Sequence, residues 1–291
     1  MRIEDPRAVI AARPRRSALY MPAANPRALE KARTLPCDVV ILDLEDAVAP
    51  DAKDEARSLA VEAVKAGGFG RREVVIRVNG LDTPWGRDDL AASATCAPDA
   101  VLVPKIAAAA DLAAYGPGLA PGVKLWAMIE TCASLFVLDQ IAGAGGPLEC
   151  LVIGGNDLAK EMRCRPGVMR EPLMGALGLS VAAARAHGLS VLDAVYNDIE
   201  DDEGLGRQCR QGVEFGFDGK TLIHPRQVDA ANAAFSPEPE AVAWSRTIVA
   251  AFDLPENSSK GVLKVEGRMV ERLHLEEARR TIAVAEAIAA A

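Results

Sequence analysis

Short apolar runs recur along the chain, and each is followed by Gly, Asn, Asp or Pro and then by an Ala-rich helical pattern. Apolar runs without alternation are typical of strands that are buried on both faces. Repeated alternation of such strands with helices predicts βαβ units and a parallel sheet. We expect strands at Ala18–Met21, Val39–Leu44, Val74–Val78, Ala100–Val103, Leu125–Ile129, Leu151–Ile153, Leu189–Val195 and Gly219–Ile223.

The segments between these strands read as amphipathic helices. Lys53–Ala66, for example, places Ala56, Leu59, Ala60 and Ala63 on one face. Eight strands that alternate with helices fit a closed (β/α)₈ barrel, the TIM barrel, better than an open sheet. The chain has 291 residues, which is enough for a barrel of roughly 250 residues and an extension.

The pattern changes after Phe235. Residues 236–291 begin with Ser-Pro-Glu-Pro and continue as a helix to about Ala251, a polar loop, two strand-like arms over Val262–Val270 around Gly267, and a last helix from near Leu275. Such a segment is too small to fold alone. We therefore predict two parts: a barrel over residues 1–235 that carries the active site, and a C-terminal helical and hairpin extension over residues 236–291.

Composition narrows the class of protein. A net charge of −8 argues against a general nucleic-acid binder, which needs a basic face. No apolar run approaches the length of a membrane span, and the first residues lack the apolar core of a signal peptide. Six scattered cysteines without a CxxC pair indicate reduced thiols. We therefore expect a cytoplasmic protein.

Acidic and basic residues gather where the predicted strands end, which is the active-site face of a TIM barrel. Glu130 follows the fifth strand and Asp157 follows the sixth, so both can face one point at the barrel mouth. Two carboxylates without a nearby His or Cys favour a hard cation such as Mg²⁺, completed by water and substrate oxygens. The alternative is that either carboxylate only caps the following helix.

Arg77 ends the third strand, and its planar fork suits a substrate carboxylate or a developing alkoxide. The alternative is an internal ion pair with Asp43 or Glu45, and both can hold because a carboxylate can orient the arginine. Asp43, Glu45 and Asp46 lie together after the second strand. Some of these charges favour a helix start, and we expect at least one to face the mouth.

Two further strand-end residues carry open interpretations. Lys105 is either a Schiff-base nucleophile or, as its acidic surroundings favour, an ion-pair partner. His224 precedes Pro225, so it takes an extended or turn conformation and is as well explained by structure as by catalysis.

Taken in order, the motifs of the chain resemble those of one family. It resembles the citrate lyase β-subunit-like branch of the HpcH/HpaI aldolase superfamily, which includes malyl-CoA and citramalyl-CoA lyases. The resemblance rests on Arg16-Ser-Ala-Leu-Tyr-Met-Pro, Asp43-Leu-Glu-Asp-Ala-Val, Ile76-Arg-Val-Asn-Gly, Pro104-Lys, Met128-Ile-Glu-Thr, Gly155-Asn-Asp-Leu and Gly219-Lys-Thr-Leu-Ile-His-Pro.

The resemblance implies roles for particular residues. Glu130 and Asp157 would be Mg²⁺ ligands, Arg77 and Glu130 would meet the substrate, and Arg16 would lie near the acyl-CoA phosphates or thioester. The assembly would be a homotrimer or a dimer of trimers, in which the tail closes over a neighbouring subunit's site. The family's tail acid comes from a pattern like Met-(Val/Ile)-Asp-x-Pro. This chain has Met269-Val270-Glu271-Arg272-Leu273, which puts Glu271 in that place.

The activity implied is Mg²⁺-dependent retro-Claisen cleavage of a 3-hydroxyacyl-CoA of the malyl, citramalyl or citryl type into a 2-oxo acid and a shorter acyl-CoA. Asp43 or Glu45 would supply the carboxylate base and Arg77 would stabilise the developing oxyanion. If Glu271 reaches the site with a water, the same centre is a thioesterase. Two further hypotheses are the β subunit of an acyl-carrier-protein-dependent citrate lyase complex, which the self-made tail argues against, and a non-catalytic barrel.

Overall fold

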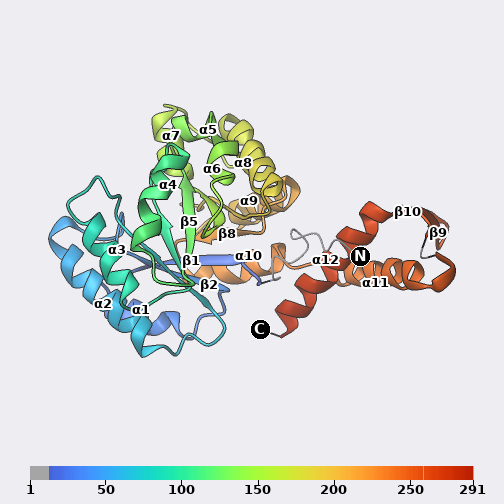
Figure 1. Cartoon of the computed structure of the whole chain (residues 1–291), viewed down its shortest axis with the longest axis horizontal. Helices are drawn as coiled ribbons and strands as arrows, with labels where there is room; N and C mark the ends of the chain where they lie inside the picture. The colour runs from blue at the N-terminus through green and yellow to red at the C-terminus, as the bar shows by residue number, and fades with distance from the viewer. Residues whose placement is uncertain (1–12, 258, 291) are drawn as a thin grey trace. The chain divides into compact units, whose positions relative to one another are not determined.

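The computed structural model describes residues 13–257 and 259–290. It divides into two compact units, Arg15–Phe235 and a unit that contains residues 236–290 (Figure 1). The boundary falls where the apolar strand and helix pattern ends, at the Ser-Pro-Glu-Pro sequence.

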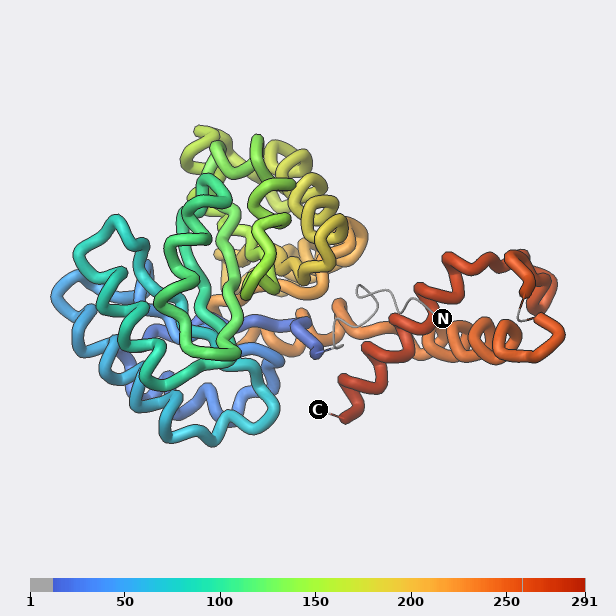
Figure 2. Tube along the Cα trace, in the orientation of Figure 1, coloured from blue at the N-terminus to red at the C-terminus, as the bar shows by residue number. Residues whose placement is uncertain are grey.

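The first unit is a closed parallel barrel in which each strand pairs with the next and β8 pairs with β1. Figure 2 follows the alternation of strand and helix around it. The predicted TIM barrel is thereby confirmed. Its strands are β1 (Ser17–Pro22), β2 (Val39–Asp43), β3 (Glu73–Arg77), β4 (Ala100–Val103), β5 (Lys124–Ile129), β6 (Leu148–Ile153), β7 (Ser190–Asp193) and β8 (Gly219–Leu222).

Helices follow the strands and cover the outside of the barrel (Figure 1). Short 3₁₀ turns extend several connections: η2 (Pro50–Ala52), η3 (Gly116–Gly118), η4 (Glu171–Leu173) and η5 (Pro225–Gln227). The α-helices are α1 (Pro26–Ala32), α2 (Lys53–Ala66), α3 (Gly86–Ala94), α4 (Ala109–Tyr115), α5 (Cys132–Leu135), α6 (Leu138–Ala142), α7 (Gly155–Glu161), α8 (Met174–Ala186), α9 (Asp202–Phe215) and α10 (Val228–Ala234).

Two strand boundaries differ from the sequence prediction by more than one residue. β6 begins at Leu148 rather than Leu151, because Glu149, which interrupts the apolar run, ion-pairs with Arg15 at 3.0 Å instead of ending the strand. β7 ends at Asp193 rather than Val195. There the Thr221 hydroxyl donates to the Asp193 carbonyl at 2.8 Å.

Alternation along the strands separates two cores. The inner core fills the barrel, and the outer core lies between the strands and the helices. On β3 the inward positions are Glu73, Val75 and Arg77, so one strand presents an acid at the amino end of the barrel and a base at the carboxyl end. The members of the inner core are Ala18, Val39, Ile41, Val75, Ala100, Leu102, Trp126, Met128, Cys150, Val152 and Leu192.

The amino end of the barrel is closed by Arg15. Its guanidinium donates two hydrogen bonds of 2.7 Å to Glu73, one of 2.9 Å to Ser190, and lies 4.9 Å from the centre of the Trp126 ring. Arg15 is 4% exposed and Glu73 is 2% exposed. A buried charge needs such a partner, since desolvation of an unpaired guanidinium is unfavourable by several kcal/mol.

The second unit contains α11 (Pro239–Asp253), η6 (Pro255–Asn257), the antiparallel pair β9 (Val262–Val265) and β10 (Arg268–Glu271), and α12 (Arg272–Ala289). The predicted hairpin is confirmed. Its turn is formed by Glu266 and Gly267, whose φ values of 48° and 84° suit a tight two-residue turn. Ile248, Phe252, Leu263, Val265, Val270, Leu275 and Ala278 form its own small core.

All six cysteines are free thiols. Within residues 13–257 and 259–290, no helix combines the length and the apolar run that a membrane span requires.

We expect Glu73→Ala to lower the free energy of unfolding by about 3 kcal/mol, because it leaves the Arg15 charge buried without its two-point partner. Urea unfolding followed by circular dichroism measures this. The control is Glu30→Ala, whose carboxylate pairs with Arg33 at the surface, and which should change the value by less than about 1 kcal/mol. Equal losses in both variants would contradict the importance of the buried pair.

Candidate active site

A cavity of about 280 Å³ opens at the carboxyl ends of the barrel strands. Residues at or after β2, β3, β5 and β6 give it a polar side, and residues after β7 and β8 give it an apolar side. Its lining consists of Tyr20, Asp43, Asp46, Ala47, Arg77, Met128, Glu130, Ile153, Gly154, Gly155, Asn156, Asp157, Val195, Thr221 and Ile223.

Arg77 is fixed by a two-point ion pair with Asp43. Its Nε and Nη2 each donate to Asp43 at 2.6 Å, and its guanidinium lies 4.8 Å from the centre of the Tyr20 ring. Burial lowers the pKa of Arg77, but the attraction of Asp43 outweighs this and leaves the pKa well above its ordinary value. The guanidinium is therefore a permanent, oriented charge. The internal ion pair considered from the sequence is present, and Arg77 also faces the cavity.

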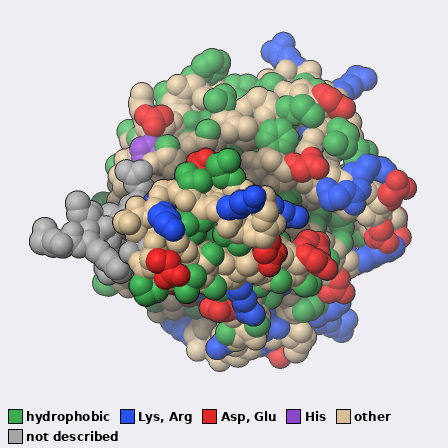
Figure 3. Space-filling model, turned by 90° about the vertical axis from the view of Figure 1, so that its right-hand side faces the viewer, with side chains coloured by type: hydrophobic (Ala, Val, Ile, Leu, Met, Phe, Trp, Pro, Cys, Tyr) green, Lys and Arg blue, Asp and Glu red, His purple; other side chains and the backbone are tan. Residues whose placement is uncertain are grey.

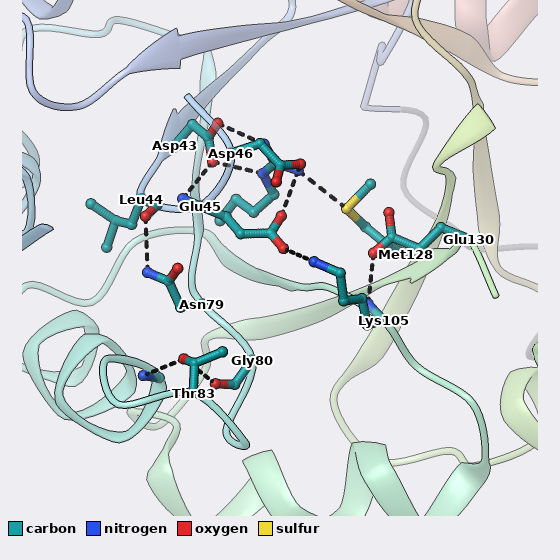
Figure 4. Close-up of polar contacts among 12 residues, drawn as sticks. Asp43, Leu44, Glu45, Asp46, Asn79, Gly80, Thr83, Lys105, Met128 and Glu130 are labelled. Atoms are coloured by element: carbon teal, nitrogen blue, oxygen red, sulfur yellow. Dashed lines mark hydrogen bonds and ion pairs between the residues drawn. The ribbon is translucent and has the colours of Figure 1, made fainter. Parts of the chain in front are cut away.

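Glu45 joins Arg77 to Lys105, and its contact with Lys105 is drawn in Figure 4. Its Oε2 lies 2.8 Å from Arg77 Nη1, and its Oε1 accepts a hydrogen bond of 2.6 Å from Lys105 Nζ. Burial raises the pKa of Glu45, and Arg77 and Lys105 act against that rise. Asp46 reaches the same guanidinium at 3.2 Å. The expectation that at least one of these acids faces the mouth is met by Asp43 and Asp46, and Lys105 is the ion-pair partner that its surroundings favoured.

Glu130 projects from the end of β5 and is 2% exposed. Its Oε1 accepts a hydrogen bond of 2.7 Å from the backbone N–H of Lys105 (Figure 4). Burial, with added repulsion from Glu45 and Asp157, raises the pKa of Glu130 to about 7. Gly154 provides the space, because a Cβ at that position would lie 2.4 Å from Glu130 Oε2.

Asp157 lies in the first turn of α7 and faces the same cavity. Among the described residues, its carboxylate makes no hydrogen bond that would identify it as a helix cap. The Glu130 and Asp157 oxygens form a hard, anionic donor pair of the kind Mg²⁺ prefers. In the described part of the chain, no group of three or more His, Cys, Asp or Glu residues could hold a metal. A cation here would therefore take its remaining ligands from water and substrate.

Two residues considered from the sequence, Arg16 and His224, lie away from this cavity, as does Asp193 at the end of β7. Arg16 precedes β1, at the amino end of the barrel, and pairs with Asp38 through contacts of 2.7 and 2.8 Å. Asp193 faces outward and is held by Lys220 at 2.9 Å and Arg170 at 2.6 Å. His224 accepts a hydrogen bond of 3.2 Å from the Arg226 N–H and caps η5, which supports its structural interpretation.

Glu271 belongs to the second unit. It is the last residue of β10 and the N-cap of α12, and its backbone N–H donates to His274 Nδ1 at 2.9 Å. Its carboxylate is exposed. Its catalytic role stays a prediction, as do those of Asp43 and Glu45.

Sequence reasoning missed the supports behind the site. Lys53 Nζ donates to the carbonyls of Leu44 and Glu45 at 2.8 and 2.7 Å, and to Asn79 Oδ1 at 2.9 Å. Asn79 in turn donates to Asp89 at 2.6 Å. This buried network fixes the loop that carries Glu45. The only sequence signal for Lys53 is a charge at a position that helix α2 buries.

A closed barrel whose carboxyl end places an oriented arginine among carboxylates is the framework of an enzyme acting on an anionic substrate. Outside this site, acidic and basic side chains are interspersed on the face of the molecule drawn in Figure 3.

Residues 16–225 match the family described as HpcH/HpaI aldolase/citrate lyase. The chain belongs to this family.

Relatives of known activity match almost the whole chain. A (3S)-malyl-CoA thioesterase of Cereibacter sphaeroides strain KD131 is 49% identical over 279 residues, which cover 96% of this chain and 97% of that protein. An L-malyl-CoA/beta-methylmalyl-CoA lyase of Cereibacter sphaeroides strain ATCC 17025 is 34% identical over 308 aligned positions, with the same two coverages.

Solved structures also match. The protein CitE of Mycobacterium tuberculosis, in complex with magnesium, acetoacetate and coenzyme A, superposes with a TM-score of 0.76 at 30% identity, over 93% of this chain and 97% of that one. A citrate lyase of Burkholderia xenovorans has a TM-score of 0.82 at 20% identity, over 97% of this chain and 95% of that one, which supports the fold alone.

The raised pKa of Glu130 predicts a pH-dependent stability. The folded chain keeps a proton up to about pH 7 that the unfolded chain loses near 4.5, so the free energy of unfolding falls as pH rises through this window. We expect Glu130→Gln to remove this fall, and hence to gain about 3 kcal/mol on the parent between pH 4.5 and 8. Urea unfolding in EDTA measures both. Parallel pH curves for parent and variant would contradict the raised pKa.

Proposed function

We propose that this chain is a Mg²⁺-dependent thioesterase that hydrolyses the thioester of a malyl-CoA-type substrate. The observation that carries the proposal is the 49% identity to (3S)-malyl-CoA thioesterase, which extends through both units of the chain. A cavity of about 280 Å³ has room for a short hydroxyacyl group, while the coenzyme extends outside it.

Glu130 and Asp157 are the residues that hold Mg²⁺. Two carboxylates that repel each other across a cavity favour a divalent cation, and magnesium is present in the related CitE structure. When bound, the ion supplies Lewis-acid polarisation of substrate oxygens. The Lys105 N–H occupies Glu130 Oε1 and leaves Oε2 for this task.

Arg77 orients the substrate. Its guanidinium is held by Asp43 and lines the cavity, so it meets the carboxylate or hydroxyl oxygen of the malyl group without a change of rotamer. The apolar side chains of Val195 and Ile223 also line the cavity and offer contacts to the carbon chain of the malyl group.

Glu271 is the proposed base. Its carboxylate accepts a proton from a water whose oxygen forms a bond to the thioester carbonyl carbon. The carbon–sulfur bond then breaks, and the thiolate takes up the proton, so that malate and free coenzyme A leave. In this proposal the second unit brings Glu271 to the site of a neighbouring subunit in a homotrimer or a dimer of trimers. The exposed position of Glu271 at the end of β10 is compatible with such a role.

A second candidate is carbon–carbon cleavage of the same substrate class to a 2-oxo acid and a shorter acyl-CoA. It is favoured by the 34% identity to an L-malyl-CoA/beta-methylmalyl-CoA lyase, which covers the same 96% of this chain. In that reaction Asp43 or Glu45 accepts the hydroxyl proton, and Arg77 stabilises charge on the oxo-acid oxygen. Both reactions use the same malyl end of the cavity.

The two candidates differ in their products. Purified protein with Mg²⁺ is given malyl-, citramalyl- and citryl-CoA, while free thiol and 2-oxo acid are followed in parallel. We expect thiol release with malyl-CoA and no oxo acid. Oxo acid without thiol would establish the lyase instead. Absence of both products would refute both candidates and favour an acyl-carrier-protein-dependent subunit or a non-catalytic barrel.

We expect Asp157→Asn to lower Mg²⁺-dependent turnover at least about 100-fold, because a neutral amide is a weak ligand for a hard dication. Titration of activity against MgCl₂ and calorimetric titration of Mg²⁺ check the effect. Asp139→Asn, which changes an exposed acid on α6, is the matched control and should behave as the parent. Equal Mg²⁺ affinity in the parent and Asp157→Asn would exclude the assigned site.

A further inference from the structure

Lys105 has a backbone conformation that its residue type makes unfavourable. It follows β4 with a φ of 54°, in the left-handed region. A side chain with a Cβ is disfavoured there by about 1–2 kcal/mol, whereas glycine adopts this region freely. What this strained residue does is therefore read from the contacts of its backbone and of its side chain.

The backbone and the side chain of Lys105 contact different parts of the site. The left-handed turn directs its N–H at Glu130 Oε1, at 2.7 Å. Its ammonium returns to Glu45 Oε1 at 2.6 Å, and the second oxygen of Glu45 contacts Arg77 at 2.8 Å. Figure 4 shows Lys105 between Glu45 and Glu130. Among the described residues, it alone bonds to both of these carboxylates.

The ammonium also changes the charge that Arg77 faces. Asp43, Glu45 and Asp46 all contact this single guanidinium. Without Lys105, the full charge of Glu45 would act on Arg77 and repel an anionic ligand in the cavity. With Lys105, part of that charge is compensated, and Arg77 keeps its attraction for a ligand carboxylate.

We propose that Lys105 is a positioning residue with two separable actions. Its backbone N–H, set by the left-handed conformation, orients the Glu130 carboxylate towards the proposed Mg²⁺ site. Its ammonium holds Glu45 and compensates the charge of that carboxylate, so that Arg77 binds the carboxylate of a hydroxy dicarboxylate ligand. The proposal rests on the proposed function for the identity of that ligand, malate being the product of hydrolysis.

Lys105→Gly separates the two actions, because glycine keeps the N–H and the left-handed backbone but lacks the ammonium. Calorimetry measures the binding of Mg²⁺ alone and of (S)-malate in the presence of Mg²⁺. We expect the Kd for Mg²⁺ to stay within about threefold of the parent value and the Kd for malate to rise about tenfold. Lys105→Arg should restore most of the malate affinity, since its guanidinium also reaches Glu45.

Arg163→Gly is the matched control. Arg163 is exposed, has the same φ of 54° and lies outside the cavity lining. It reports the effect of a glycine at such a position on folding alone, and its ligand affinities should equal those of the parent. Thermal unfolding of both glycine variants verifies that they fold.

The outcomes are decisive in both directions. Unchanged malate affinity in Lys105→Gly would overturn the role of the ammonium, and loss of Mg²⁺ binding in that variant would overturn the role of the N–H. If the parent binds malate with Mg²⁺ but hydrolyses no CoA thioester, the proposed function fails while the inference about Lys105 is still tested. Where turnover is present, KM should rise in Lys105→Gly with kcat within about twofold.

Discussion

The two-point ion pair between Arg77 and Asp43 is the interaction on which the rest of the site depends. Both residues occupy the last inward positions of adjacent strands, β3 and β2. Neither charge is tolerable there alone, because the barrel interior removes it from water. Together they fix the guanidinium in one plane, and its Nη1 is directed at Glu45 and Asp46. The orientation of Arg77 therefore follows from the pairing of two strands rather than from a flexible loop.

The acids around this pair outnumber the bases, and that imbalance is the site's main chemical property. Asp43, Asp46, Glu130 and Asp157 line the cavity together with one arginine. The raised pKa of Glu130 expresses the same excess, because burial and neighbouring carboxylates disfavour its ionised form. Such a centre gains from a cation and from a ligand that shares it. The site is thus less stable when empty than an apolar core of equal size, as functional sites commonly are.

The sequence predicted most of the fold and the members of the site, and failed where partners come from distant elements. Predominantly apolar runs identified every barrel strand, because strands buried on both faces need few polar positions. The hairpin could be located from Gly267. By contrast, Asp193 resembles a mouth residue in the sequence, but the parity of β7 turns it outward to the buried Lys220. The two contacts of Lys105 depend on a backbone angle that no spacing encodes.

The choice between hydrolysis and carbon–carbon cleavage was open from the sequence for a physical reason. Both reactions bind the same hydroxy acid end, so the strand-end residues that recognise it are expected in either enzyme. They differ at the thioester. Hydrolysis needs a water and a base at the thioester carbonyl carbon, whereas carbon–carbon cleavage leaves the thioester intact and converts it to an enolate. In this chain the candidate base, Glu271, lies in the second unit. A shift of about 1 Å in a reacting group changes a rate by about a hundredfold. On the proposed mechanism, the position of the Glu271 carboxylate decides the reaction, and the barrel, which the sequence describes well, is the part that the two reactions share.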